Sequence, residues 1–223
     1  MKLRAIGKFN ILIVAVILFS TVKLYAYDDG DFQIWNTEVE EMQLKKDLKL
    51  SFEQEFRWGD NVKEFYYQHY DVGLSYNLNK YWNVGGGYRH VLNKTKGKFL
   101  VENEPYVTAT FNDQFAGFKY DDRSRLEYNY FDYKDDTWRY RNKLTIKAPW
   151  KFTKLEFQPF VADELFILFD DGQRLSENRS TAGLAMTITK NLKAEVYYMF
   201  RTVKSGVKWT DTNVFGTKLK LAF

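Results

Sequence analysis

Two neighbouring stretches of the sequence carry charged side chains at every second position. They are Asp121, Arg123, Arg125 and Glu127 in the first stretch and Arg139, Arg141 and Lys143 in the second. If the two stretches are antiparallel strands joined near residues 132–136, Glu127 lies opposite Arg139 or Arg141, within cross-strand reach. Glu164 lies on the corresponding face of a later stretch. Such a set can pair with itself, or it can select anionic solutes, as charged rings do in pores.

We expect mutual pairing to be the main role of these charges, because acidic and basic residues are mixed on neighbouring stretches. The paired charges would then fill and stiffen the interior of a narrow barrel. The alternative is a basic constriction formed by the four arginines of the two stretches. It would admit small anionic solutes such as acidic oligosaccharides.

The sequence offers one weak candidate for a hydrolytic site. His69 and Asp71 share a face of one predicted strand, and Ser51 lies on the preceding strand. A serine, a histidine and an acid can form a hydrolase site when the serine and histidine come within hydrogen-bond reach. However, no nucleophile motif surrounds Ser51, and same-face residues two apart on a strand are about 7 Å apart. We therefore predict no catalytic residue, and a lipid-modifying enzyme is the third hypothesis.

Composition bears on several other classes of protein and site. The chain has no cysteine, which excludes a disulfide scaffold and a cysteine-based zinc site. At 45% hydrophobic residues it is too apolar to be mostly disordered. The sequence contains no cluster of metal ligands, phosphate-binding loop or nucleotide motif, so we expect neither a metal nor a cofactor.

The charged residues belong to segments in which apolar and polar residues alternate with period two. From residue 48 onward this alternation predicts β-strands. The predicted strands are roughly 10 to 14 residues long, whereas strands of soluble proteins average about six. The greater length fits a tilted bilayer crossing. The chain has 16 Tyr, 19 Phe and 6 Trp, and the aromatics gather near strand ends, as in the interfacial girdles of outer-membrane barrels.

Residues 1–26 have the features of a cleaved secretory signal. Lys2, Arg4 and Lys8 precede an uncharged run over residues 9–22, and Leu24-Tyr25-Ala26 is a plausible cleavage site. The run is shorter than the roughly 20 residues of a spanning helix, and a retained anchor is the alternative. Without this segment the 33 Lys+Arg become 29, equal to the 29 Asp+Glu. The mature chain is therefore neutral, and nothing predicts nucleic-acid binding.

The C-terminus resembles the assembly signal of bacterial outer-membrane proteins. The chain ends on Phe223, preceded by Leu221, Leu219 and Phe215 in the same alternation. We therefore expect an all-β fold, with residues 27–223 forming a single antiparallel transmembrane β-barrel. The expected location is the outer membrane of a Gram-negative bacterium, and the expected partners are the lipid bilayer and the barrel-assembly machinery.

Strand number and connection lengths follow from the same pattern. Eleven strands are legible, but bacterial barrels of this kind have even counts. The alternatives are twelve strands, one of them hidden, or ten strands with the N-terminal segment inside or capping the barrel. Connections predicted to be short alternate with longer ones, which indicates short periplasmic turns and longer outer loops. The longer ones are expected at residues 59–63, 92–98, 132–136, 170–176 and 204–212.

Residues 35–223 resemble an uncharacterised family of Gram-negative outer-membrane barrels, domain-of-unknown-function family 2490. The resemblance rests on residues 53–57 (Glu-Gln-Glu-Phe-Arg), 122–128 (Asp-Arg-Ser-Arg-Leu-Glu-Tyr) and 139–142 (Arg-Tyr-Arg-Asn), and on the final Phe223. Ser124 and Asn129 depart from the asparagine and arginine of the family pattern, and an arginine beside Glu104 is missing. The family implies a barrel and brings no known activity. The chain is also distantly similar to twelve-stranded porins for acidic oligosaccharides.

We therefore expect a narrow barrel with an ion-paired interior, in a structural or accessory role in the cell envelope and without enzymatic activity. The alternative is a channel for small anionic solutes. An enzyme acting on lipids ranks third.

Overall fold

The structure is a computed structural model that describes residues 29–170 and 172–223. In this part of the chain the segments of alternating apolar and polar residues form eleven strands. The predicted signal segment, residues 1–26, lies outside these residues. The strands are β1 Asp31–Lys45, β2 Leu48–Gly59, β3 Glu64–Asn77, β4 Trp82–Thr95, β5 Lys98–Phe115, β6 Phe118–Phe131, β7 Thr137–Lys147, β8 Gln158–Asp170, β9 Gly172–Thr187, β10 Leu192–Ser205 and β11 Lys208–Ala222. No helix among the described residues is long and apolar enough to cross a membrane.

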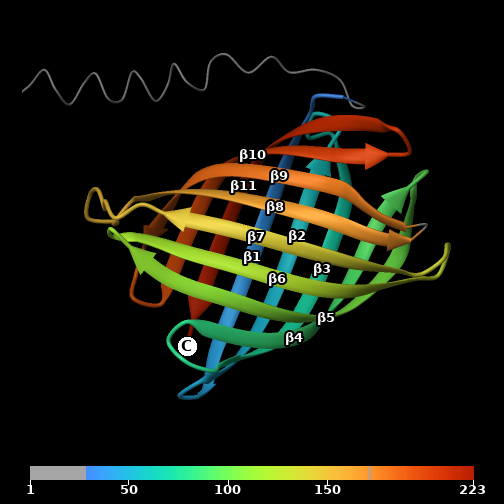
Figure 1. Cartoon of the computed structure of the whole chain (residues 1–223). Coiled ribbons are helices and arrows are strands. Elements are labelled where there is room, and N and C mark those ends of the chain that lie inside the picture. The colour runs from blue at the N-terminus through green and yellow to red at the C-terminus, as the bar shows by residue number, and fades with distance from the viewer. Residues whose placement is uncertain (1–28, 171) are drawn as a thin grey trace, which may run out of the picture.

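The eleven strands form one closed barrel (Figure 1). Consecutive strands pair antiparallel, as predicted, whereas β1 and β11 close the barrel as a parallel pair from Asp31↔Thr212 to Glu41↔Ala222. The prediction of an even strand count is therefore wrong: no twelfth strand is needed, and the first strand lies in the wall. An odd count leaves both terminal strands running in the same direction. Parallel pairing still satisfies their edges.

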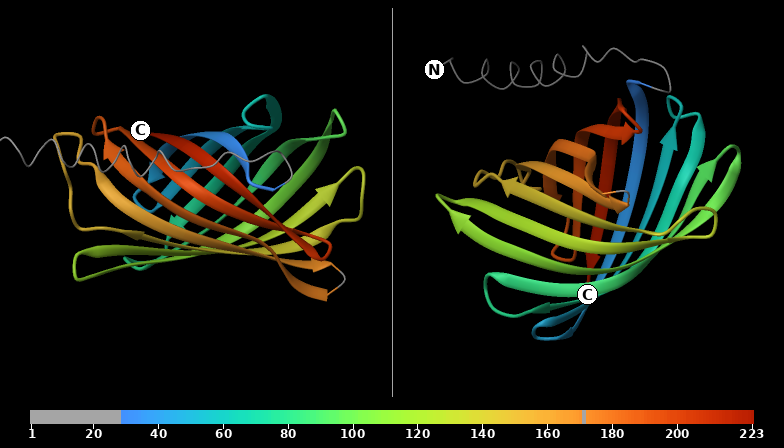
Figure 2. Two further views of the ribbon diagram at one scale, coloured as in Figure 1. Left: turned by 90° about the horizontal axis from the view of Figure 1, so that it is seen from above. Right: turned by 45° about the vertical axis from the view of Figure 1, so that its right-hand side comes forward.

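Each end of the barrel holds one chain terminus of the described part. We call the end with Phe223 the C-terminal end, because the Phe223 amide donates to the Glu41 carbonyl at 2.9 Å beside the β1–β2 turn. The opposite end, where β1 begins at Asp31, is called the N-terminal end. The strands form the wall of the barrel and run between its two ends at an angle to the barrel axis (Figure 2).

The connection lengths differ from the prediction. At the N-terminal end the strands are joined by residues 60–63, 96–97, 132–136, 171 and 206–207, and at the C-terminal end by residues 46–47, 78–81, 116–117, 148–157 and 188–191. The longest connection thus lies at the C-terminal end, where short turns were expected. Polar segments expected to be outer loops, such as residues 208–212, instead continue the strand pairing. Residues 148–157 leave the sheet and form their own bridge between Phe152 and Phe157.

Alternation sorts the side chains into an inner and an outer set. In β1 the odd residues from 31 to 39 are buried and the even ones are not. On the outer face every strand exposes at least one large apolar side chain. One example from each, in chain order, is Met42, Phe52, Val72, Tyr88, Val107, Leu126, Leu144, Val161, Leu184, Phe200 and Leu219. The barrel therefore has an apolar outer belt and a polar interior.

Several polar side chains also occupy the outer face, and neighbouring strands satisfy them. Asn142 donates to Asp122 at 2.7 Å, and Ser180 donates to Asp163 at 2.8 Å. Each of these bonds joins adjacent strands. Cross-strand hydrogen bonds of this kind lower the cost of placing polar groups on an apolar surface.

The run Gly85-Gly86-Gly87 in β4 leaves room for a side chain inside the barrel. A Cβ atom on Gly87 would lie 2.5 Å from the Tyr106 hydroxyl and 2.5 Å from the Val72 carbonyl oxygen. The Tyr106 ring crosses this space, and its hydroxyl donates to Asp71 at 2.6 Å. Glycine here serves close packing of the interior.

Candidate functional site

The charged face predicted for residues 121–127 and 139–143 points into the barrel. β6 and β7 pair so that Glu127 lies directly opposite Arg139, and Arg125 lies opposite Arg141. The connection over residues 132–136 and the alternation of the two strands set this register, and a shift of one residue would turn every charge outward. The hairpin therefore holds these charges side by side in the interior.

Glu127 is the centre of this group. Its side chain is 0% exposed. The distance from its carboxylate oxygens to the nearest guanidinium nitrogen is 2.6 Å for Arg125, 2.5 Å for Arg139 and 2.9 Å for Arg141. Three cations around one carboxylate leave a positive excess. Glu104 of β5 offsets part of it, because Arg139 also donates to that carboxylate at 2.7 Å.

Glu164 forms a second centre, supplied by β8. Arg141 lies 2.9 Å from its carboxylate, Arg123 lies 3.1 Å away, and Arg179 lies 3.8 Å away. The Phe166 ring packs beneath these groups, with its centroid 4.6 Å from the Arg141 guanidinium carbon. Because Arg141 contacts both Glu127 and Glu164, it links the two centres into one network.

Two residues of the predicted charge cluster, Asp121 and Lys143, form no direct ion pair among the described residues. Within the described residues, neither the Asp121 nor the Lys143 side chain makes a hydrogen bond or an ion pair within 4 Å. Asp121 lines an opening of about 520 Å³ at the C-terminal end, and Lys143 lines an inner cavity of about 140 Å³. They lie nearer the C-terminal end than Glu127, where the interior is less tightly filled.

A further set of charges completes the network from the other side of the barrel. Arg89 of β4 pairs with Asp71 at 3.0 Å and with Glu53 at 3.3 Å. Glu53 also pairs with Lys218 at 3.2 Å. The alternation predicts inner positions for these residues, but no motif singles them out. Asp71 lies directly opposite Arg89 in the β3–β4 hairpin, whereas Lys218 reaches Glu53 from β11, which is distant in sequence.

Arg57 is held mainly by aromatic rings, which the sequence did not indicate. Its guanidinium carbon lies 3.6 Å from the Trp35 ring centroid and 3.8 Å from the Tyr67 centroid. It also pairs with Glu55 at 2.6 Å. Trp35 of β1 and Tyr67 of β3 lie directly opposite Arg57 of β2, so the stack follows from the pairing of three consecutive strands.

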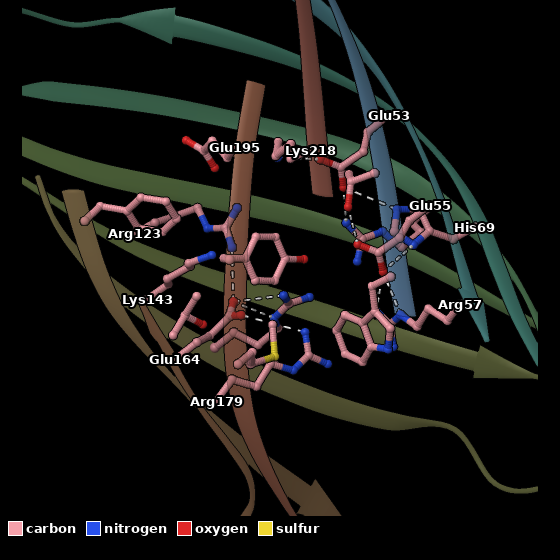
Figure 3. A pocket seen from close by; sticks show the side chains of 18 residues that line it. Glu53, Glu55, Arg57, His69, Arg123, Lys143, Glu164, Arg179, Glu195 and Lys218 are labelled. Atoms are coloured by element: carbon pink, nitrogen blue, oxygen red, sulfur yellow. Dashed lines mark hydrogen bonds and ion pairs between the residues drawn. The ribbon is translucent and has the colours of Figure 1, made fainter. Parts of the chain in front are cut away.

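The inner cavity lies between the Glu164 centre and the Glu53–Glu55 side of the network (Figure 3). Figure 3 shows Arg123, Lys143 and Arg179 beside Glu164, and His69 and Arg57 beside Glu55. The volume of about 140 Å³ is small for a ligand pocket, which typically measures about 300–1,000 Å³. Among residues 29–170 and 172–223, no group of three or more His, Cys, Asp or Glu is arranged to hold a metal ion.

The serine and histidine considered for hydrolysis are apart. Ser51 lies opposite Gly73 and donates to its carbonyl at 3.3 Å, whereas His69 lies opposite Glu55. Four positions along a strand correspond to about 13 Å, well beyond a hydrogen bond. His69 instead contacts Tyr67 at 3.1 Å and Glu53 at 3.2 Å. Its ring is thus engaged by the interior network.

The sequence of this barrel matches one family of proteins. The chain matches the family model described as "Protein of unknown function (DUF2490)" over residues 32–212. The chain belongs to this family. The match confirms the resemblance carried by residues 53–57, 122–128 and 139–142. No curated protein and no solved structure shows a significant match.

In this DUF2490 protein the predicted assembly residues lie on the outer face of β11 and just beyond it. The buried positions of β11 are Thr212, Val214 and Gly216, so Phe215, Leu219 and Leu221 point the other way. Leu219 is exposed, and the terminal Phe223 is 65% exposed. The four residues form an apolar edge beside the closing seam.

Proposed function

We propose that this DUF2490 protein is a closed, non-conducting β-barrel of the Gram-negative outer membrane, with a structural or accessory role in the envelope and without enzymatic activity. The barrel-assembly machinery would insert it, and the lipid bilayer would surround it. Arg123, Arg125, Arg139 and Arg141 would then serve as structural partners of buried carboxylates. They would not be a filter for solutes.

Membrane insertion is supported by the outer face. Exposed apolar side chains on all eleven strands give a continuous belt, which soluble monomers rarely expose. The strands contain 11 to 18 residues, and a tilted strand needs about 9–11 to cross a bilayer. The polar interior fits a barrel that turns its charges away from lipid.

The observation that carries the proposal of a closed barrel is the burial of side chains across the interior near the N-terminal end. Glu127, Val91 and Val214 are 0% exposed, Trp35 is 1% exposed and Asn129 is 2% exposed. These residues come from β1, β4, β6 and β11, and Phe166 of β8 and Met199 of β10, 2% and 6% exposed, add the other side of the barrel. Side chains lining a water-filled path would be exposed. The interior is therefore filled at this level.

The ion pairs also favour a fixed filling over a gate. Removing one partner of a buried ion pair leaves an uncompensated charge and costs about 3–5 kcal/mol. Opening a path past Glu127 would separate several such pairs together. The anion-channel alternative would require this separation each time a solute passes.

A liposome-swelling assay tests closure. The mature chain is refolded into phosphatidylcholine vesicles, and heat-modifiable migration on a gel shows that the barrel has formed. We expect swelling in arabinose no faster than that of protein-free vesicles. Solute entry that depends on protein concentration would contradict the proposal. Recovery of the expressed protein in the inner-membrane or soluble fraction, and not in the outer membrane, would contradict the location.

A further inference from the structure

We infer that the mouth of the barrel at the C-terminal end is a binding site for small phosphate-bearing anions. The mouth holds a cavity of about 480 Å³. Six lysines line it, from β6 to β11 and the β7–β8 connection: Lys119, Lys147, Lys151, Lys193, Lys218 and Lys220. Glu195 is the acidic residue in this lining. This inference goes beyond the proposed envelope role, because the site needs no path through the barrel.

Ion pairing inside the mouth leaves positive charge uncompensated. Lys147 pairs with Glu195 at 3.0 Å, Lys218 pairs with Glu53 at 3.2 Å, and Lys220 pairs with Glu41 at 2.7 Å. Lys151 pairs with Glu156 at 2.7 Å, so four of the six lysines have a carboxylate partner. The side chains of Lys119 and Lys193, by contrast, make no hydrogen bond or ion pair with any described residue. Both are exposed, so their ammonium groups are available to a ligand.

The deeper wall adds to the same excess. The inner cavity shares Lys218 and Glu195 with the mouth, so the two spaces adjoin. Arg123 and Lys143 line it beside Glu164 (Figure 3), and the Lys143 side chain has no direct partner among the described residues. An anion that enters the mouth therefore meets cations at the rim and beneath it. The closed N-terminal end would retain the ligand.

Lysine and cavity size together indicate the class of ligand. An ammonium group on a flexible stem is a point charge that binds phosphate from many directions, whereas arginine suits planar, two-pronged contacts. In this barrel arginines of the interior serve the buried network, whereas the cations that line the mouth are all lysines. A volume of about 480 Å³ falls in the range of small-molecule pockets. A phosphorylated small molecule fits these conditions.

The ligand is a soluble molecule and not a lipid headgroup. Lys119, Lys147 and Lys193 occupy inward positions of their strands, so the site opens along the barrel axis. A lipid would have to leave the bilayer and enter the mouth. Free pyrophosphate is therefore a suitable probe, and anionic vesicles separate the two sources.

Calorimetric titration of the refolded chain in phosphatidylcholine vesicles with pyrophosphate tests the inference. Lys119→Ala/Lys193→Ala should weaken binding by about tenfold or more, since each factor of ten corresponds to about 1.4 kcal/mol. The control is Lys46→Ala/Lys190→Ala, which removes two exposed lysines from turns at the same end that do not line the cavity. The control should bind as the unaltered chain does. Lys119→Arg/Lys193→Arg should retain most of the affinity, because it retains the charge.

Three results would overturn the inference. The unaltered chain gives no heat of binding at millimolar pyrophosphate, the two alanine pairs weaken binding equally, or phosphatidylglycerol vesicles abolish binding by occupying the site. Heat-modifiable migration of each variant shows that the barrel has folded. A barrel that swells vesicles but binds pyrophosphate would overturn the proposed function alone. A closed barrel without binding would overturn this inference alone.

Discussion

At the scale of single residues, the interior is organised by a few carboxylates that each hold several cations. Glu127 contacts three arginines and Glu164 contacts Arg123, Arg141 and Arg179. Buried pairs are not strongly stabilising compared with apolar packing. Their loss is costly, however, because the remaining partners cannot reach water.

Glu127→Gln should lower the free energy of unfolding by about 3–5 kcal/mol, because the amide leaves buried arginines without their counter-charge. Urea unfolding in phosphatidylcholine vesicles measures the change. Glu156→Gln is the control, since Glu156 pairs with Lys151 at 2.7 Å with both side chains nearly half exposed. It should cost less than about 1 kcal/mol. Equal effects of the two substitutions would show that the interior pairs are not buried as described.

The packing of Tyr106 over β4 gives a second prediction. Gly87→Ala should destabilise the barrel by about 1–3 kcal/mol, because the added methyl group collides with the Tyr106 hydroxyl and the Val72 carbonyl. Gly86→Ala faces the other way, and its nearest contact is 3.1 Å, so it should cost less. Urea midpoints of the two variants compare them directly. A smaller loss for Gly87→Ala than for Gly86→Ala would contradict the packing.

At the scale of elements, the parallel seam between β1 and β11 distinguishes this barrel from the expected even-numbered one. Asn36 faces Thr217 across the seam, and their side chains hydrogen-bond at 3.0 Å. The chain contains no cysteine, so introduced cysteines report cleanly on this register.

Asn36→Cys/Thr217→Cys should form a disulfide on mild oxidation, because directly paired strand residues have a Cα separation suited to the bond. Non-reducing gel migration and mass spectrometry detect it. Asn36→Cys/Leu221→Cys, displaced by four residues on β11, should stay reduced. Crosslinking of the displaced pair, or its absence in the first, would contradict the parallel register.

Much of the wall could be predicted from sequence, since each strand carries its own alternation. Residues 121–127 and 139–143 were placed on the inner face because period two fixes the face of every residue. The closing partner of β1 could not be predicted in this way, because a seam depends on the whole sheet. The same holds for the contacts of Lys218 with Glu53 and of Lys147 with Glu195. These groups join strands that no local pattern connects.

The connections show a second limit of local pattern. Residues 208–212 are polar enough for a loop, yet they pair with β10 because the hairpin extends beyond the apolar belt. Polarity therefore indicates where the apolar belt ends. It does not indicate where the strand ends.

At the scale of the whole molecule, the two ends of the barrel differ. Buried side chains fill the interior near the N-terminal end, whereas a lysine-lined cavity opens at the C-terminal end. The arginines stabilise the filled part, and the lysines leave the open part cationic. The same barrel thus combines a filled interior at the N-terminal end with the proposed anion-binding mouth at the C-terminal end.

Single-channel recording of the refolded mature chain in a planar bilayer tests the central claim, a closed interior, most directly. Heat-modifiable migration first shows that the barrel is folded, and Arg139→Ala/Arg141→Ala is recorded alongside. We expect a silent bilayer for the unaltered chain, since buried side chains fill the interior around Glu127 and its arginines. Steady anion-selective openings that the double variant loses would contradict this account and would establish an anion channel.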